Sequence, residues 1–369
     1  MVYEQPPFAP AVYAARRENL QASLQQRGLA GCVLVQRANR LYFTGFGPHG
    51  GSLTRLVALA VPARGEPLYV ISDIDRERAA AAGLVHAAPA SYGEGPGLLA
   101  RCVAGWGPGP VGIEAGEMPV SVPQGLGRAV ARELVACDDL PAGLRMVKSD
   151  EEISVLRAAS DLTDKAVEAA RRAIAPGVSE LEIAGLLVHE LMRAGADGPS
   201  IMPFVLSGER AMMPHLRPAA RPAGAGEVVV IDFGAALQGY ETDICRSYAC
   251  GEATALAQEL HGIVSEAFAA SVAACRPGAT GGDVHRAAAD VIGRAGHGAH
   301  FNHAVGHGCG LQSHEGPLCN ASSEVVLREG MVLAIEPAIY FGGVGLRLED
   351  DIVVRPGGGE SLNRAGMAL

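Results

Sequence analysis

Apolar residues in the first third of the chain recur with the spacing of alternating helices and strands. In residues 11–28 they follow the three- and four-residue intervals of an amphipathic helix, which we expect to end at Gly28. Short apolar runs follow at residues 29–36, 53–72 and 110–114, and a Pro/Gly turn inside the second run predicts two adjoining strands. The alternation indicates an α/β domain of about 130 residues.

The pattern changes after an acidic stretch with Pro and Gly at residues 138–143, which we interpret as a linker. Ser149 and Glu152 then have the spacing of a capping box, so a long helix is expected from Ser149 onward. The sequence therefore predicts two domains, at residues 1–143 and 144–369.

An internal repeat occupies the second domain. Pro176 and Pro277 each belong to a Pro-Gly turn and stand 101 positions apart, as do Gly195 and Gly296, which each end an Arg-Ala-Gly. Each turn has a helix pattern on both sides, and apolar, strand-like runs follow at residues 227–234, 331–337 and 348–354. Duplication predicts two similar α/β halves related by a pseudo-twofold axis, with a cleft between them.

Composition and charge exclude several classes of protein. Hydrophobic residues make up 49% of the chain, yet no apolar run approaches the ~20 residues that span a bilayer, and the start lacks a signal-peptide core. The net charge of −10, without any basic run, argues against nucleic-acid binding. The eight cysteines form no C-x-x-C pair, which is typical of reduced thiols. We expect a cytoplasmic protein that binds neither membranes nor nucleic acid.

Histidines concentrate in one short segment. Five of the 11 lie within residues 297–314, a density typical of a metal or acid–base site, because buried imidazoles need polar partners. Cys309 lies among them, so a Cys–His nucleophile is an alternative to a metal site. The metal interpretation is favoured because it accounts for more of the same residues.

Carboxylates stand at the ends of apolar runs in the second domain. Such positions are costly for a charge unless it is paired or binds a metal. Together with His307 these acids form an oxygen-rich donor set that suits a pair of Mn²⁺, Co²⁺ or Zn²⁺ ions. The acids are Asp232, Asp243, Glu336 and the Glu349–Asp351 run.

Five segments, in this order and spacing, resemble the pita-bread metallopeptidase family, which includes methionine aminopeptidase, aminopeptidase P and prolidase. They are MPHLRP, IDFGAALQGYETDICRSY, HAVGHGCGLQSHEGP, MVLAIEPAIY and GLRLEDDIVV. The resemblance covers about residues 149–369, and the earlier segment NRLYFTGF is similar to the creatinase/prolidase-type N-terminal domain. It implies an α/β protein, with a creatinase-like domain followed by a pseudo-twofold pita-bread catalytic domain.

The resemblance also implies two divalent metal ions, with Mn²⁺ favoured and Co²⁺ or Zn²⁺ as alternatives. Asp232 would bind one ion, Asp243 and Glu349 would bridge both, and His307 and Glu336 would bind the other. The implied catalytic side chains are His215, His303, His314, Glu336 and Arg347. Cys245 stands where the family usually has Thr, from which we expect altered tuning of the site without loss of activity.

The implied activity is hydrolysis of Xaa-Pro bonds in small peptides, with a dipeptidase favoured over an enzyme of the aminopeptidase P type. A non-peptidase hydrolase or lyase of the same fold is a further alternative. The complete ligand set argues against a role in binding alone. Related enzymes are homodimers, so we expect a homodimer. The Gly-rich loop of His49 and Arg55 is either a lid over the partner's cleft, with one of these side chains at the substrate end, or an ordinary surface turn.

Overall fold

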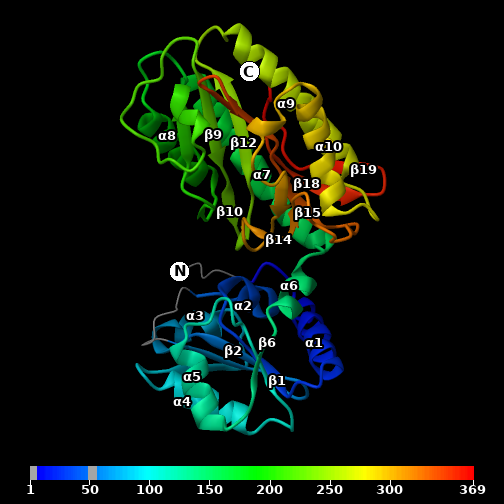
Figure 1. Ribbon diagram of the computed structural model, residues 1–369. Coiled ribbons are helices and arrows are strands. Elements are labelled where there is room, and N and C mark those ends of the chain that lie inside the picture. The colour runs from blue at the N-terminus through cyan, green and yellow to red at the C-terminus, as the bar shows by residue number, and fades with distance from the viewer. Residues whose placement is uncertain (1–5, 49–55) are drawn as a thin grey trace. The chain divides into compact units, whose positions relative to one another are not determined.

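The computed structural model describes residues 6–48 and 56–369. It divides into two compact units, Met1–Arg145 and Met146–Leu369, which are described separately below (Figure 1). The loop with His49 and Arg55, expected to act as a lid, lies outside the described residues.

The N-terminal unit is built on a six-stranded sheet with the strand order β4-β3-β2-β1-β5-β6. Strand β2 pairs antiparallel with β1 and β3, while β4, β5 and β6 extend the sheet in parallel on the two sides. The strands are β1 (Gly31–Leu34), β2 (Ala58–Pro62), β3 (Leu68–Ser72), β4 (Ala87–Ala90), β5 (Val111–Ile113) and β6 (Leu134–Ala136).

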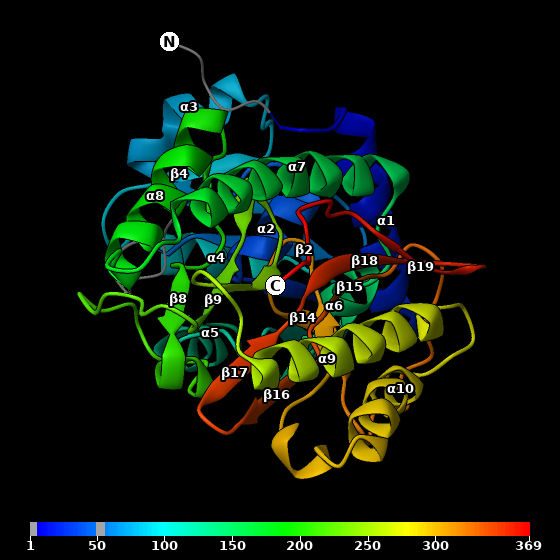
Figure 2. The same cartoon turned by 90° about the horizontal axis from the view of Figure 1, so that it is seen from above.

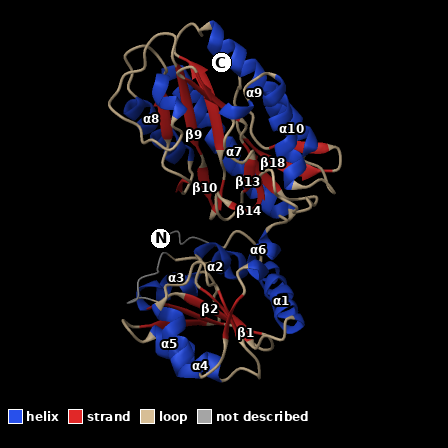
Figure 3. Cartoon of the chain, in the orientation of Figure 1, coloured by secondary structure: helices blue, strands red, loops and turns tan. Residues whose placement is uncertain are grey.

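Except between β2 and β3, helices separate these strands along the chain, and they lie around the sheet (Figure 3). They are α1 (Pro10–Gln26), α2 (Arg37–Thr44), α3 (Arg76–Ala81), α4 (Gly95–Ala104), α5 (Ser121–Val130) and α6 (Asp139–Arg145), with a short 3₁₀ turn at Asp73–Asp75. Apolar side chains of α4 and α5 share one buried cluster with those of the central strands, so the unit has its own core.

The predicted helix and strands of this unit are confirmed, and Gly28 follows α1 with a φ of 69°. The predicted linker at residues 138–143 is wrong, because most of this stretch belongs to α6. Pro141 lies in the first turn of that helix, where its missing N–H removes no hydrogen bond, and Asp139 favours the same turn.

The C-terminal unit consists of two halves, each of which begins with a pair of helices and continues with a set of short strands. The first half contains α7 (Asp150–Ala173), α8 (Glu180–Ala194), β7 (Gly198–Pro199), β8 (Phe204–Ser207), a 3₁₀ turn at Gly208–Met212, β9 (Val228–Phe233), β10 (Ala235–Leu237), β11 (Tyr240–Glu241) and β12 (Ile244–Ala249).

The second half contains α9 (Ala255–Ala274), α10 (Gly281–Arg294), a 3₁₀ turn at Gly298–His300, β13 (Gly306–Gly308), β14 (Glu315–Cys319), β15 (Val332–Ile335), β16 (Ala338–Phe341), β17 (Val344–Arg347), β18 (Asp350–Arg355) and β19 (Gly358–Ser361). Figure 2 shows α7 beside α8 and α9 beside α10, as two helix pairs.

The duplication predicted from the sequence is confirmed by these elements. The antiparallel order β8-β9-β12 of the first half recurs as β13-β15-β18 in the second. The second helix of each pair begins with a capping box, on Ser179 in one half and on Thr280 in the other, at the 101-residue offset of the repeat. Each half buries its own apolar cluster, so each supplies a rigid support for the residues at its strand ends.

Within the described part of the chain, no helix is both long and apolar enough to cross a membrane.

Candidate metal centre and active site

Pairing of β9 with β12 sets the positions of the two aspartates in the first half. The strands are antiparallel, with Asp232 opposite Cys245, and Asp243 stands directly before β12. The chain between them leaves to form β10 and β11, which belong to a separate small sheet. Asp232 and Asp243 thus meet at one end of the strand pair, as expected from a hairpin-like return of the chain.

Pairing of β15 with β18 sets the positions of the two glutamates in the second half. Ile335 lies opposite Asp350, so Glu336, which follows β15, and Glu349, which precedes β18, flank one end of this strand pair. The two halves then meet at Cys245 and Glu349, whose backbones exchange hydrogen bonds of 3.3 and 3.0 Å. This contact brings all four carboxylates to the junction of the halves.

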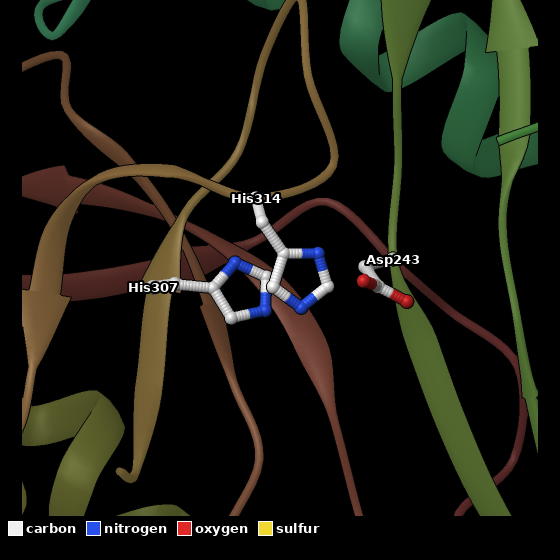
Figure 4. A group of neighbouring side chains, drawn as sticks. All are labelled: Asp243, His307 and His314. Carbon is white, nitrogen blue, oxygen red and sulfur yellow. The ribbon is translucent and has the colours of Figure 1, made fainter. Parts of the chain in front are cut away.

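The ligand-type atoms of these residues converge in three overlapping groups, in each of which the atoms lie within 4.8 Å of one another. The groups are Asp232, Asp243 and Glu349; His307, Glu336 and Glu349; and Asp243, His307 and His314. The structure therefore brings together all five residues expected to hold metal. It also places His314, expected on the substrate side, within reach of the same atoms (Figure 4).

Burial and crowding make these carboxylates unfavourable as bare charges. Asp243 and Glu349 are each 2% exposed, and buried oxygens of Asp232 and Asp243 (Oδ1 in both) have no hydrogen-bond partner within residues 6–48 and 56–369. Burial, reinforced by the charge of Asp232, raises the pKa of Asp243 well above its usual range. Burial and the charge of Asp243 do the same to the pKa of Glu349.

Divalent ions fit this donor set. Such ions require carboxylate oxygens and an imidazole nitrogen held within a few ångström of each other. Oδ1 of Asp232 and of Asp243 have no hydrogen-bond partner among the described residues. His307 binds the Gly308 carbonyl through Nδ1, which leaves Nε2 for an ion. The charge of an ion would also compensate the repulsion that raises the pKa values of the acids in its absence.

Arg347 is the one cation that contacts this carboxylate cluster within the described residues. It lies on β17, is 6% exposed, and its Nη2 donates to Oδ2 of Asp232. Its Nη1 lies 3.7 Å from Oε2 of Glu336. Arg347 therefore links an acid of the first half to an acid of the second.

The expected catalytic histidines are positioned differently from one another. The His314 ring stacks on that of His307 at a centroid distance of 3.8 Å (Figure 4). His303 binds the carbonyl of Ala304 through Nδ1 at 2.7 Å, and Nε2 lies 3.4 Å from the Tyr340 hydroxyl. Burial lowers the pKa of both His303 and His314, which favours neutral imidazoles at neutral pH. His215 lies in an exposed loop after β8.

Two contacts at the site were missed by reasoning from the sequence alone. Tyr340 lies on β16, and its hydroxyl is 3.4 Å from Nε2 of His303, which lies in a loop 37 positions earlier. Asp351, counted among the acids at the end of an apolar run, lies inside β18, fully buried, and accepts a hydrogen bond from the backbone of Asp243. The segments MVLAIEPAIY and GLRLEDDIVV contain these two residues, but neither segment specifies the contact.

The cysteines near the site are inert. Burial raises the pKa of Cys245 to about 12, so this residue is a neutral thiol behind the ligands. Burial also raises the pKa of Cys309 well above its usual range, and its Sγ donates to the carbonyl of Glu241. A Cys309 nucleophile, the alternative drawn from the sequence, would need an accessible thiolate and is not supported by this environment.

The two-unit fold and its buried cluster of acids and imidazoles define a metal-dependent enzyme. Residues 154–356 match the model of Metallopeptidase family M24, and residues 16–147 match that of the Creatinase/Prolidase N-terminal domain. The chain belongs to metallopeptidase family M24 and carries the creatinase/prolidase type of N-terminal domain, as the sequence motifs indicated.

Similar proteins include peptidases with solved structures. The chain is 36% identical over 243 residues to a Xaa-Pro dipeptidase of Pyrococcus horikoshii, covering 66% of this chain and 69% of that protein. A Xaa-Pro dipeptidase from Bacillus anthracis superposes with a TM-score of 0.89 at 30% identity, over 97% of this chain and 99% of the other. An X-Pro aminopeptidase from Thermotoga maritima superposes with a TM-score of 0.87 at 27% identity, over 96% and 98% of the two chains.

Proposed function

We propose that this protein is a Xaa-Pro dipeptidase that hydrolyses small peptides with two divalent ions, Mn²⁺ first among them. The observation that carries the proposal is the convergence of Asp232, Asp243, His307, Glu336 and Glu349 in overlapping groups of ligand atoms within 4.8 Å. The relatives named as Xaa-Pro dipeptidases support the choice of substrate, since the match to the Bacillus anthracis structure covers nearly the whole of both chains.

We expect the ligands to divide between the two ions as the family resemblance implies. Asp232 would hold one ion, His307 and Glu336 the other, and Asp243 and Glu349 both. Two ions so placed would supply Lewis acidity toward water and the scissile carbonyl. Mn²⁺ suits a set with four carboxylates and one imidazole, and Co²⁺ and Zn²⁺ are the alternatives.

Glu336 and the side chains around the ligands would transfer the proton and stabilise the charge that develops on the substrate. Glu336, which is 17% exposed in its side chain, would take the proton of the attacking water and return it to the leaving nitrogen. Neutral His314 would donate a hydrogen bond to the carbonyl oxygen or the leaving group, and His215 would approach from its exposed loop. Neutral His303 carries its proton on Nδ1, toward the Ala304 carbonyl, so its Nε2 would accept a hydrogen bond from the Tyr340 hydroxyl or from the substrate. Arg347 would hold Asp232 and Glu336 in place while the charge on the substrate changes.

We further propose a homodimer in the cytoplasm. All eight cysteines are free, which supports a reducing compartment. Size-exclusion chromatography with light scattering tests the dimer, and a monomer at assay concentrations would contradict it.

Hydrolysis of matched peptides tests the substrate. The panel contains Xaa-Pro dipeptides, Xaa-Pro-Xaa tripeptides and the same peptides without proline, each assayed with Mn²⁺, Co²⁺ and Zn²⁺. Preferred cleavage of the dipeptides supports the proposal, whereas preferred cleavage of tripeptides supports an aminopeptidase, as the similarity to the Thermotoga maritima enzyme allows. Absence of cleavage throughout, in protein with two bound ions, would indicate a different small-molecule substrate.

A further inference from the structure

Asp351 is not one of the expected metal ligands, but its side chain contacts the backbone of one of them, Asp243. Its side chain is 0% exposed, and Oδ2 accepts a hydrogen bond of 3.1 Å from the N–H of Asp243. We propose that Asp351 is a positioning residue, which fixes the backbone at Asp243 and thereby the carboxylate expected to bridge two metal ions. This inference rests on the metal site of the proposed function.

The fold gains little from a carboxylate at this position. Ile352, Val353 and Val354 continue the same strand and are all 0% exposed, so an apolar residue at 351 would continue a buried apolar strand. Across residues 6–48 and 56–369, no Lys, Arg or His forms an ion pair with Asp351. A buried acid without such a partner costs stability, which points to a role other than packing.

The preceding residue, Asp350, is a buried acid with a structural role on the same strand, and it serves as a comparison for Asp351. It is 3% exposed, its Oδ1 lies 2.6 Å from Nη2 of Arg246, and its Oδ2 accepts a 2.7 Å bond from Ser361. Both oxygens of Asp350 therefore have strong partners on the far side of the strand. Asp351 points the opposite way, toward the ligands, since successive side chains of a strand face opposite sides.

Asp351 is itself held by a chain of contacts. Its N–H donates to Oδ1 of Asn363 at 3.0 Å, and Nδ2 of Asn363 donates to Oδ1 of Asp164, on α7, at 3.3 Å. The carbonyl of Asp351 accepts a 2.9 Å bond from Leu362. The acceptor for Asp243 therefore belongs to a rigid network that starts on the first half, passes through the second and returns to the first.

The geometry of a bridged metal pair requires such a support. Asp243 and Glu349 come from different halves, which the bridge between Cys245 and Glu349 joins. Hydrogen bonds from Arg246 and Ser247 to residues 347, 349 and 350 join the same halves. Among these contacts, the bond from Asp243 to Asp351 is the one that holds the backbone of Asp243 itself. It therefore fixes the position of Asp243 relative to Glu349, and ligand positions of this kind must hold within about 0.5 Å.

The test compares Asp351→Ala with Asp351→Asn, with Asp290→Asn on the exposed surface of α10 as the matched control. Mn²⁺ affinity is measured by calorimetry on metal-free protein, and electron paramagnetic resonance of the loaded protein reports whether two Mn²⁺ ions are coupled through shared ligands. We expect D351A to weaken Mn²⁺ binding by about 10- to 100-fold and to lose the coupled signal. D351N keeps an acceptor oxygen and should retain the coupled signal, and D290N should match the wild type.

A second variant keeps the inference testable if D351A does not fold. Asn363→Ala removes the acceptor that holds Asp351, and should weaken Mn²⁺ binding in the same direction by a smaller factor. Two bound ions in the wild type, with wild-type affinity and coupling in folded D351A or in N363A, would overturn the role of Asp351 alone. A wild-type protein that binds no pair of ions would overturn the proposed function, and this inference with it.

Discussion

Buried carboxylates occur in both units, but their surroundings differ. Glu114 in the N-terminal unit is 1% exposed, and its Oε2 accepts a 2.7 Å bond from the N–H of Gln36. The N–H of Val35 and Nδ2 of Asn39 donate to the same carboxylate. Asp243 in the C-terminal unit is 2% exposed, and its Oδ1 accepts no hydrogen bond from any described residue.

The difference separates a structural acid from one that requires a cation. Burial raises the pKa of both groups, but hydrogen bonds to Glu114 oppose the rise, whereas the charge of Asp232 adds to it at Asp243. Three donors of the N-terminal unit compensate the charge of Glu114 in part. At Asp243 no described donor reaches Oδ1, and this is the physical argument that the carboxylates around Asp243 serve to bind metal.

Removal of a bridging acid should have the largest effect. In Asp243→Ala or Glu349→Ala the shared ligand of both ions is lost, so metal content should fall from about two equivalents to less than one. Because metal ions supply several kcal/mol of transition-state stabilisation, kcat/KM should fall by about a thousandfold or more. Elemental analysis and peptide assays measure both effects, and full metal content in either variant would contradict the assignment.

The matched change in the N-terminal unit should act on stability alone. Glu114→Ala leaves the donors of Val35, Gln36 and Asn39 buried without an acceptor, which costs about 1–3 kcal/mol of unfolding free energy. Metal content should stay at the wild-type value. Denaturant titration measures the unfolding free energy, and elemental analysis measures the metal content. A loss of metal in Glu114→Ala would contradict the distinction between a structural acid and an acid that requires a cation.

The histidines sharpen the comparison within the catalytic unit. His307→Ala should lower metal content, while His314→Ala should keep it and lower kcat, with a loss of about 2–4 kcal/mol if one hydrogen bond to the oxyanion is removed. His314 lies close enough to Asp243 and His307 to share an ion. If H314A loses a full metal equivalent, His314 is a ligand and its assignment to the substrate side is wrong.

Much of the fold and site could be predicted because it depends on local patterns. One capping box, the Pro-Gly turns and the apolar runs identified the repeated helices and strands, and the family resemblance of the ordered motifs identified the five ligand candidates. The missed contacts depend on register between distant segments. The bond from Asp243 to Asp351 joins residues 108 positions apart, and that from Tyr340 to His303 joins strand β16 to a loop. No local pattern encodes how the two halves align at Cys245 and Glu349.

The smallest predicted effect concerns pH and the structural acid. The folded-state pKa of Glu114 is raised, so between its unfolded and folded pKa values the native protein binds more protons than the unfolded chain. Stability due to this group is therefore greatest in acid and falls as the pH rises. Glutamine does not titrate, so any stability deficit of Glu114→Gln relative to wild type should narrow as the pH rises above about 4.5, while contributions of other groups cancel in the difference. Urea midpoints of the two metal-free proteins at several pH values measure this change. If the difference in unfolding free energy between wild type and Glu114→Gln instead widens as the pH rises, the prediction is wrong. The three donors would then stabilise the charged form of Glu114 more than burial destabilises it, so the N-terminal unit would hold this acid as a fully compensated anion.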